Sequence, residues 1–314
     1  MTSPVPGTRV VILLATYNGA TYLQEQLASI AAQDHDDWHL IWRDDGSADA
    51  SAAIVDVFAA TQPAGRVARL ADPAGNVGSA ASFLALLRHA VTGLGPHDLV
   101  AFADQDDVWL PFKLARATKA LAATNADSPA IYSARQILVD AQLNRLAVSA
   151  LLTTPPAFPA SLTQNLATGC TLALNHAAAM LVAGSTAPSG CQHDWWAYLL
   201  VTAAGGAFVA DDEPVVLYRQ HDRNAVGTPR SFTWRGIAAM RRGPGMFMGL
   251  MRQNVAALDA QRHLLTPQAR DQVAELKAAL DGNTLHRLRT LRMQGLRRQT
   301  RAEQMLFRLW FLCG

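Results

Sequence analysis

The chain has 314 residues, of which 50% are hydrophobic, and its formal net charge is +2. A chain of this length can bury a large core, and so small a charge argues against general nucleic-acid binding. No apolar run approaches the roughly 20 residues of a membrane-spanning helix, and the N-terminus, MTSPVPGTRV, lacks the basic and apolar regions of a signal peptide. We therefore expect a globular protein of the cytoplasm.

The first half of the chain alternates strand and helix patterns. Continuous apolar or β-branched runs predict strands, and apolar residues at helical spacing between them predict helices. The predicted strands span 9–15, 38–43, 66–70 and 98–104, and the predicted helices span 21–33, 48–60 and 81–91. Strands that alternate with helices indicate an α/β fold, with a mostly parallel sheet and helices on both faces.

The second half is less regular. Its patterns predict a strand over 131–140, a loop leading into a strand over 164–176, a helix over 193–206 and a pair of strands over 207–221. From Arg230 onward the pattern becomes helical and basic, with an interruption at RRGPG, residues 241–245. We therefore expect a helical C-terminal extension.

Polar segments follow three of the predicted strands: ATYNG at 15–19, RDDGS at 43–47 and ADQDD at 103–107. Because ligands of parallel sheets bind beyond the carboxyl ends of the strands, these segments should converge on one crevice. The last segment places three carboxylates, Asp104, Asp106 and Asp107, within four positions. Such carboxylates repel one another unless a positive charge lies between them, so the crevice is expected to bind a cation.

Five motifs in a fixed order carry a resemblance to a known family. They are ATYNG (15–19), RDDGSAD (43–49), NVGSAASF (76–83), DQDDVWLPFK (104–113), and HDWW (193–196) followed by LYRQH (217–221). Over roughly residues 8–227 the chain resembles the family 2 glycosyltransferases of the GT-A fold, and among them the rhamnosyltransferase-like members that build bacterial surface polysaccharides. The resemblance implies a Rossmann-like GT-A catalytic domain over 1–228, with a nucleotide-sugar-binding half (8–125) and an acceptor-binding half (126–228), followed by the helical extension (229–314).

The activity that this resemblance implies is the inverting transfer of a sugar from a nucleotide diphosphate to a saccharide or lipid-linked saccharide, in the synthesis of cell-surface polysaccharide such as O-antigen. L-rhamnose from dTDP-L-rhamnose is the first expectation and a UDP-hexose the second, because thymine and uracil present the same ring N–H. The alternative is a non-catalytic relic of the fold that binds carbohydrate or nucleotide. Such a relic would be expected to lack the acidic motif or the general base, and this chain has both. A haloacid-dehalogenase-type phosphatase is disfavoured, because Arg43 stands where that chemistry needs an acid.

Within the family, Asp104-Gln105-Asp106 is the DXD motif. The leaving diphosphate gains negative charge as the glycosidic bond breaks, and a divalent cation neutralises that charge. Mg²⁺ and Mn²⁺ need only a few carboxylate oxygens, since phosphates and water complete their shell. The resemblance implies that Asp106 is a metal ligand and that Asp104 binds the ribose or the metal's water shell. Asp107 either belongs to this site or caps the helix that Pro111 opens.

The residues that the resemblance assigns to the nucleotide-sugar are Thr16, Tyr17, Asn18, Asp45, Asn76, Gly78, Asp104 and Gln105. Asp45 would accept a hydrogen bond from the ring N–H of uracil or thymine, and Tyr17 would stack on the base. Asn76 and Gly78 match the loop that closes on the donor, although Gly78 is also explained as the start of a helix. Alone, TYNG and DDGS are ordinary turn sequences, but together with the acidic motif they indicate one site.

An inverting transfer needs a general base on the acceptor hydroxyl, and the matching family position is Asp194, at the start of an aromatic-rich helix. Trp195 and Trp196 either stack on sugar rings or pack in the core. His193 is expected to be a hydrogen-bonding neighbour rather than a ligand.

His221, in LYRQH, matches a family histidine that contacts the metal or the diphosphate, and its ordinary explanation is a structural residue. Arg219, in the same motif, is an alternative source of positive charge. The sequence does not choose between them.

After Thr284 the chain has seven arginines and a single acidic residue, Glu303. The apolar stretch Met305–Leu312 would extend only about 12 Å as a helix, too short to span a bilayer but suited to its interface. These features predict peripheral attachment to the anionic inner face of the cytoplasmic membrane. The alternative is that the apolar end packs on the catalytic domain, or on a second subunit in a homodimer.

Overall fold

The computed structural model describes residues 7–72, 74–154, 156–221 and 232–314, and of 232–244 it describes the backbone alone. The chain forms two compact units. Unit 1 consists of Met1–Leu151, Ala167–Gly184 and Gly206–Arg219, and unit 2 of Leu152–Leu166, Ser185–Gly205 and Gln220–Gly314.

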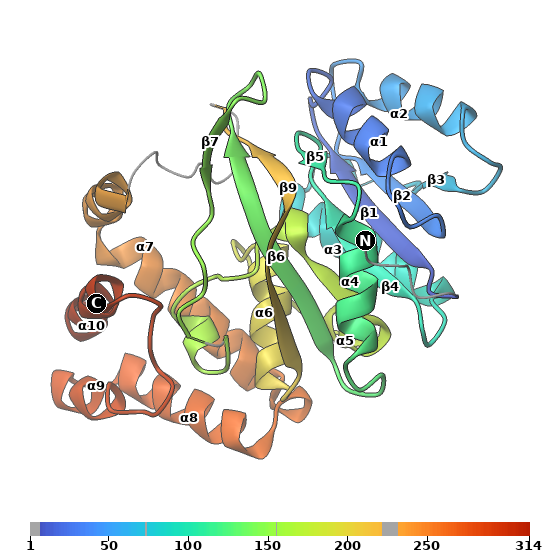
Figure 1. Ribbon diagram of the computed structural model, residues 1–314. Coiled ribbons are helices and arrows are strands. Elements are labelled where there is room, and N and C mark those ends of the chain that lie inside the picture. The colour runs from blue at the N-terminus through green and yellow to red at the C-terminus, as the bar shows by residue number, and fades with distance from the viewer. Residues whose placement is uncertain (1–6, 73, 155, 222–231) are drawn as a thin grey trace. The chain divides into compact units, whose positions relative to one another are not determined.

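A nine-stranded sheet forms the frame of unit 1, in the order β3-β2-β1-β4-β8-β6-β9-β5, with β7 paired to β6 (Figure 1). Its strands are β1 (Val10–Thr16), β2 (Trp38–Asp44), β3 (Val67–Arg69), β4 (Leu99–Ala103), β5 (Val108–Trp109), β6 (Ala130–Val139), β7 (Arg145–Val148), β8 (Ala173–Asn175) and β9 (Ala207–Arg219). Strands β1 to β4 pair in parallel, as do β6 and β9, whereas β5, β7 and β8 are antiparallel to their neighbours. The predicted α/β fold with a mostly parallel sheet is confirmed.

Five α-helices belong to unit 1: α1 (Leu23–Ala31), α2 (Ser51–Ala60), α3 (Ser79–Ala90), α4 (Lys113–Ala122) and α5 (His176–Ala183). The first three follow the predicted alternation, and α1 buries Leu27 and Ile30 in the same core as Leu14 of β1. The sequence patterns did not predict α5. Asn175 is its N-cap, and the Asn175 side chain accepts a hydrogen bond from the Ala178 N–H at 2.9 Å.

The strand β9 is continuous where the sequence pattern predicted a pair of strands. It runs parallel to β6, and the register shifts so that Ala134 pairs with Asp211 while the next residue, Arg135, pairs with Pro214. The polar segment 211–214 therefore forms a bulge rather than a turn. Aspartate and proline favour turns locally, but continued pairing with β6 outweighs that preference.

Unit 2 is mainly helical and contains α6 (His193–Ala203), α7 (Phe232–Ala260), α8 (Pro267–Asp281), α9 (Thr284–Thr290) and α10 (Arg301–Cys313). Both α7 and α9 pack on α8 and α10 (Figure 1). The predicted interruption at 241–245 is wrong, since α7 passes through it. A proline removes one backbone hydrogen bond, and the rest of this 29-residue helix tolerates that loss. Among the described residues, no helix combines the length and the apolar character needed to cross a bilayer.

The apolar end of α10 lies in the core of unit 2. Phe307, Trp310 and Phe311 are at most 8% exposed. The ring of Phe247, on α7, lies 6.1 Å from the Phe307 ring and 5.6 Å from the Trp310 ring, measured between centroids. The aromatic residues that we expected at a membrane interface are therefore buried within the protein.

Candidate active site

Three loops follow the carboxyl ends of β1, β2 and β4. In the sheet register, Thr16 at the end of β1 pairs with Asp44 at the end of β2, and Leu14 of β1 pairs with Ala103 at the end of β4. The three predicted segments therefore begin next to one another at one edge of the sheet. Hydrogen bonds between side chains and backbone then join the loops.

The side chain of Gln105 joins the acidic turn to the loop after β1. The Tyr17 N–H donates to its Oε1 at 2.8 Å, and its Nε2 donates to the Tyr17 carbonyl oxygen at 3.0 Å. A Cβ on Gly19 would lie 2.1 Å from the same Oε1, so the side chain could not keep this position if Gly19 carried one. Gln105, which was expected to bind the nucleotide, uses its amide to hold Tyr17.

The loop after β1 is also bonded to the loop after β2. Asn18 has a left-handed backbone with φ of 47°, donates its N–H to Ser47 Oγ at 2.9 Å and accepts a backbone N–H at 2.8 Å. Thr16 is buried, and its hydroxyl donates to Asp44 Oδ1 at 3.0 Å. Two of the residues expected to line the nucleotide pocket thus bond to protein groups, whereas Tyr17 keeps 48% of its surface exposed.

Asp45, the residue expected to contact the base, is buried and bonded to the loop before α3. Its carboxylate accepts from Arg43 Nη1 at 2.5 Å and from the N–H groups of Val77 and Gly78, both at 2.8 Å. Gly78 precedes α3 with φ of 84°, a conformation that favours glycine, so it is also the helix start. Asp45 therefore fixes the loop that was expected to close on the donor, and Asn76 in that loop is exposed.

Asp107 is fully buried, whereas Asp104 and Asp106 are partly exposed. The Asp107 Oδ1 accepts the N–H of Arg219 at 3.1 Å. Burial and the neighbouring charges of Asp106 and Asp104 raise the pKa of Asp107 well above its usual value. The alternative that Asp107 caps the next helix is wrong, because α4 begins after Phe112 and has no side-chain cap.

Arg219 holds the acidic turn from the end of β9. Its Nε donates to the Asp106 carbonyl oxygen at 2.9 Å, its Nη1 donates to the Ala141 carbonyl oxygen at 2.6 Å, and its Nη2 pairs with Glu25. The guanidinium also lies 4.3 Å from the centroid of the Tyr22 ring. With every nitrogen used by the protein and 1% of the residue exposed, Arg219 is better suited to positioning the turn than to binding a diphosphate.

Sequence analysis did not identify two buried residues near the acidic turn, Lys113 and Cys170. Lys113 is 2% exposed, and its Nζ lies 3.0 Å from the centroid of the Trp109 ring. Burial lowers the pKa of Lys113 to about 7, while the nearby Cys170 and Asp107 oppose this shift. Burial also raises the pKa of the Cys170 thiol. Lys113 was visible at the end of the DQDDVWLPFK motif, but Cys170 reaches this place only through the fold.

The acidic turn offers carboxylate oxygens, the kind of ligand that Mg²⁺ and Mn²⁺ prefer. Within the part of the chain that the structure describes, Asp104, Asp107 and Cys170 are grouped with one ligand atom of each lying within 4.8 Å of the others. A buried thiol with a raised pKa is a poor ligand for Mg²⁺ or Mn²⁺, which prefer oxygen. The carboxylates of Asp104 and Asp106 offer oxygen atoms from partly exposed positions, and so remain the better donor set.

In unit 2, Asp194 is the second residue of α6 and is 8% exposed. Its Oδ1 accepts the N–H of Trp195 at 2.6 Å. Trp196 is core, with its Nε1 donating to Ser185 Oγ at 2.8 Å. Burial lowers the pKa of His193 to about 3, which makes it a neutral structural neighbour. The roles of Asp194 and His221 remain predictions from the resemblance.

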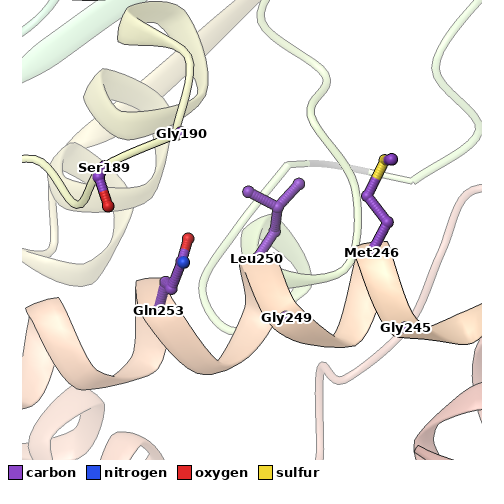
Figure 2. A pocket seen from close by; sticks show the side chains of 7 residues that line it. All are labelled: Ser189, Gly190, Gly245, Met246, Gly249, Leu250 and Gln253. Carbon is purple, nitrogen blue, oxygen red and sulfur yellow. The ribbon is translucent and has the colours of Figure 1, made fainter.

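Unit 2 also contains an open groove of about 420 Å³ (Figure 2). The side chains of Met246, Leu250 and Gln253 point into it from α7, opposite Ser189 and Gly190. The described residues that line the groove carry no titratable side chain.

The sequence profile of Glycosyl transferase family 2 matches residues 11–181 of this chain. The chain is 28% identical over 232 residues to dTDP-rhamnosyl transferase RfbG of Shigella flexneri, in an alignment that covers 70% of this chain and 75% of that protein.

Solved structures show the same architecture. TarS 1–349 of S. aureus in complex with UDP-GlcNAc is similar with a TM-score of 0.58 and 16% identity, over 87% of this chain and 72% of that one. The mannosyltransferase PcManGT of Pyrobaculum calidifontis, in complex with GDP-Man and Mn²⁺, is similar with a TM-score of 0.52 and 18% identity, over 99% and 88% of the two chains. At these identities the similarity establishes the fold alone.

Proposed function

The chain belongs to Glycosyl transferase family 2, and on that basis we propose that it transfers L-rhamnose from dTDP-L-rhamnose to a saccharide or lipid-linked saccharide, with inversion at the anomeric carbon. The relative named dTDP-rhamnosyl transferase supports the choice of sugar and base. A UDP-hexose is the second candidate donor, because uracil presents the same ring N–H as thymine.

The observation that carries this proposal is the anchoring of the acidic turn, 104–107, on both sides. Gln105 bonds it to the loop after β1, and Arg219 bonds it to the end of β9. Asp104 and Asp106 would hold Mg²⁺ or Mn²⁺, and the bound ion would neutralise the charge that develops on the leaving diphosphate. Because the turn is ordered before the donor arrives, little ordering free energy opposes binding.

The remaining roles are those that the family resemblance implies. Asp45 would accept the ring N–H of the base, and Tyr17, half-exposed, would stack on it. Asp194 would take the proton of the acceptor hydroxyl as that oxygen attacks the anomeric carbon. One displacement with no covalent intermediate inverts the configuration.

Calorimetric titration with dTDP tests the proposal. We expect binding at least about tenfold tighter with Mn²⁺ than with chelator, and loss of that difference in Asp106→Asn. Asp56→Asn, at an exposed position on α2, is the matched control. Equal affinity with and without metal, in a preparation that transfers sugar, would contradict the metal site.

Donor identity is tested separately, by thermal shift with Mn²⁺ against dTDP-L-rhamnose, UDP-hexoses and GDP-mannose. The largest stabilisation is expected from dTDP-L-rhamnose. Stabilisation by the purine nucleotide alone would contradict the pocket. A protein that binds the donor but never releases dTDP in the presence of acceptor would be a non-catalytic relic.

We further propose that the C-terminal extension attaches the protein to the anionic inner face of the cytoplasmic membrane, where a lipid-linked acceptor would lie. The exposed large apolar residues of α9 and α10 are Leu285, Leu288, Met305 and Leu309. The exposed arginines of the same region are Arg289, Arg292, Arg297, Arg301 and Arg308. Each of these arginines contributes on the order of 1 kcal/mol to binding near an anionic leaflet, so together they support attachment to the membrane.

A further inference from the structure

Arg43 joins the end of β2 to the loop that precedes α3, and each nitrogen of its guanidinium has a partner. Nε donates to Asp72 Oδ2 at 2.9 Å, Nη1 donates to Asp45 Oδ1 at 2.5 Å and to Ser82 Oγ at 2.8 Å, and Nη2 donates to the Gly75 carbonyl oxygen at 2.7 Å. The side chain is 1% exposed. Burial opposes its charge, but the hydrogen bonds to Asp45 and Asp72 outweigh that effect and raise the pKa of Arg43.

The loop 72–78 supplies the other contacts of Asp45. Oδ1 also accepts the Val77 N–H and Oδ2 accepts the Gly78 N–H, both at 2.8 Å. A carboxylate offers about four acceptor positions, so these three bonds leave one, on Oδ2. An ion-paired carboxylate can only accept. The remaining position therefore suits a ring N–H, as in uracil and thymine, and repels the bare ring nitrogen of cytosine.

We propose that Arg43 is a positioning residue for base selection: it holds Asp45 as a fixed acceptor and ties that acceptor to the loop 72–78. The inference rests on the proposed function, in which Asp45 faces the base. Without Arg43, the buried carboxylate of Asp45 has no cation beside it, and it loses the bonds that join it through Arg43 to Asp72 and Gly75. A carboxylate that Arg43 no longer holds does not present a fixed acceptor to the base, so selectivity falls even where binding persists.

The readout is the ratio of the dissociation constants of CDP and UDP, measured calorimetrically with Mn²⁺. Diphosphate, ribose and metal are common to both ligands, so their contributions cancel. We expect the wild type to bind UDP at least about tenfold tighter than CDP, and Arg43→Met to reduce the ratio below about threefold. Arg43→Lys keeps the charge but cannot span Asp45, Asp72 and Gly75 together, so it should restore selectivity only in part.

Two further variants provide a milder perturbation of Arg43 and a control. Asp72→Asn removes the charge of one partner of Arg43 without leaving a buried carboxylate unpaired, and should give an intermediate ratio even if Arg43→Met folds poorly. Arg116→Met breaks the 2.7 Å pair with Asp211, between α4 and β9 in the same unit, and should leave the ratio unchanged.

The outcomes separate the two proposals. If Arg43→Met and Asp72→Asn weaken UDP and CDP binding by the same factor, Arg43 is only structural and the inference is overturned. If the wild type binds neither diphosphate with Mn²⁺, the proposed function itself fails.

Discussion

Gln105 and Tyr17 exchange two hydrogen bonds, from the Tyr17 N–H to Oε1 at 2.8 Å and from Nε2 to the Tyr17 carbonyl oxygen at 3.0 Å. One side-chain amide thus satisfies both backbone polar groups of Tyr17, as a neighbouring strand would. The acidic turn and the loop that carries Tyr17 are therefore coupled, and a change in one is expected to disturb the other.

This coupling predicts non-additive substitutions. Gln105→Ala removes both bonds, and Gly19→Ala places a Cβ 2.1 Å from Oε1, so the amide must move away. Each variant should weaken Mn²⁺-dependent dTDP binding by about three- to tenfold, and the double variant should be no weaker than the worse single one. Calorimetric titration of the wild type, the two single variants and the double variant measures this double-mutant cycle. Gly93→Ala is the control, because nothing lies within 4 Å of its added Cβ. Additive losses would mean that Gly19 acts independently of Gln105.

Asp194→Asn should lower turnover by roughly 100-fold or more, because an amide cannot take the acceptor proton. The substitution keeps an oxygen that can accept the Trp195 N–H, so the start of α6 should persist. Affinity for dTDP should stay within about twofold of wild type, since the proton is taken from the acceptor. Steady-state kinetics and NMR of the anomeric configuration provide the measurement. Normal turnover in the variant, or retained configuration in the wild-type product, would refute this assignment.

His193 should make the protein sensitive to acid. Burial lowers its pKa from 6.5 to about 3, so between these values the unfolded chain binds a proton that the folded protein excludes. Stability is therefore lost as the pH falls from 6.5 toward 3. Relative to His193→Gln, the wild type should lose about 1 kcal/mol of unfolding free energy per pH unit between about pH 6 and 4.

Urea unfolding at several pH values measures this difference. The variant His97→Gln, at an exposed position, is the control. A constant difference between wild type and His193→Gln across this range would show that His193 does not carry the effect.

The membrane proposal is best tested by surface substitutions, because truncation at Asn283 would remove Phe307, Trp310 and Phe311 from the core. The two test sets change Leu285, Leu288, Met305 and Leu309 to Gln, or Arg289, Arg292 and Arg301 to Gln. The wild type should sediment with vesicles that contain anionic lipid at low salt, and both sets should stay in the supernatant.

Neutral vesicles and Arg145→Gln, an exposed arginine on β7, are the controls. A wild-type protein that remains in the supernatant with anionic lipid would contradict the proposed membrane attachment. A dimer in analytical ultracentrifugation that the leucine substitutions dissociate would instead assign this surface to a second subunit.

The convergence of the three polar segments could be predicted from the sequence, because it depends on strand order and on the residues immediately after each strand. The turn residues after β1, β2 and β4 are local signals, and parallel pairing brings them together. The partners of the expected ligands could not be predicted in this way. Nothing in RDDGS indicates that Arg43 bonds Asp45 and Asp72, and nothing near Cys170 indicates that it approaches Asp104.

The structure is continuous at two places where the sequence patterns predicted a break. At 211–214 and at 241–245, local residues favour a break, while the structure continues as β9 and as α7. In β9 the register with β6 shifts on both sides of the Arg135–Pro214 pair, and regular pairing resumes where Gln136 pairs with Val216. Pairing partners distant in the sequence contribute more than a local turn preference, and they are invisible to a pattern of single residues.

The burial of Cys170 provides a way to time motions of the acidic turn. Cys170 and Cys191 are buried, while Cys313 is exposed, so a thiol reagent should modify Cys313 at once and the other two only after local opening. Burial raises the pKa of both inner thiols, to about 12 for Cys191, which slows their reaction further. Because Cys170 lies beside Asp104 and Asp107, its labelling rate measures how often the acidic turn opens. Bound metal and nucleotide should lower that rate, and the decrease would report occupancy of the proposed site.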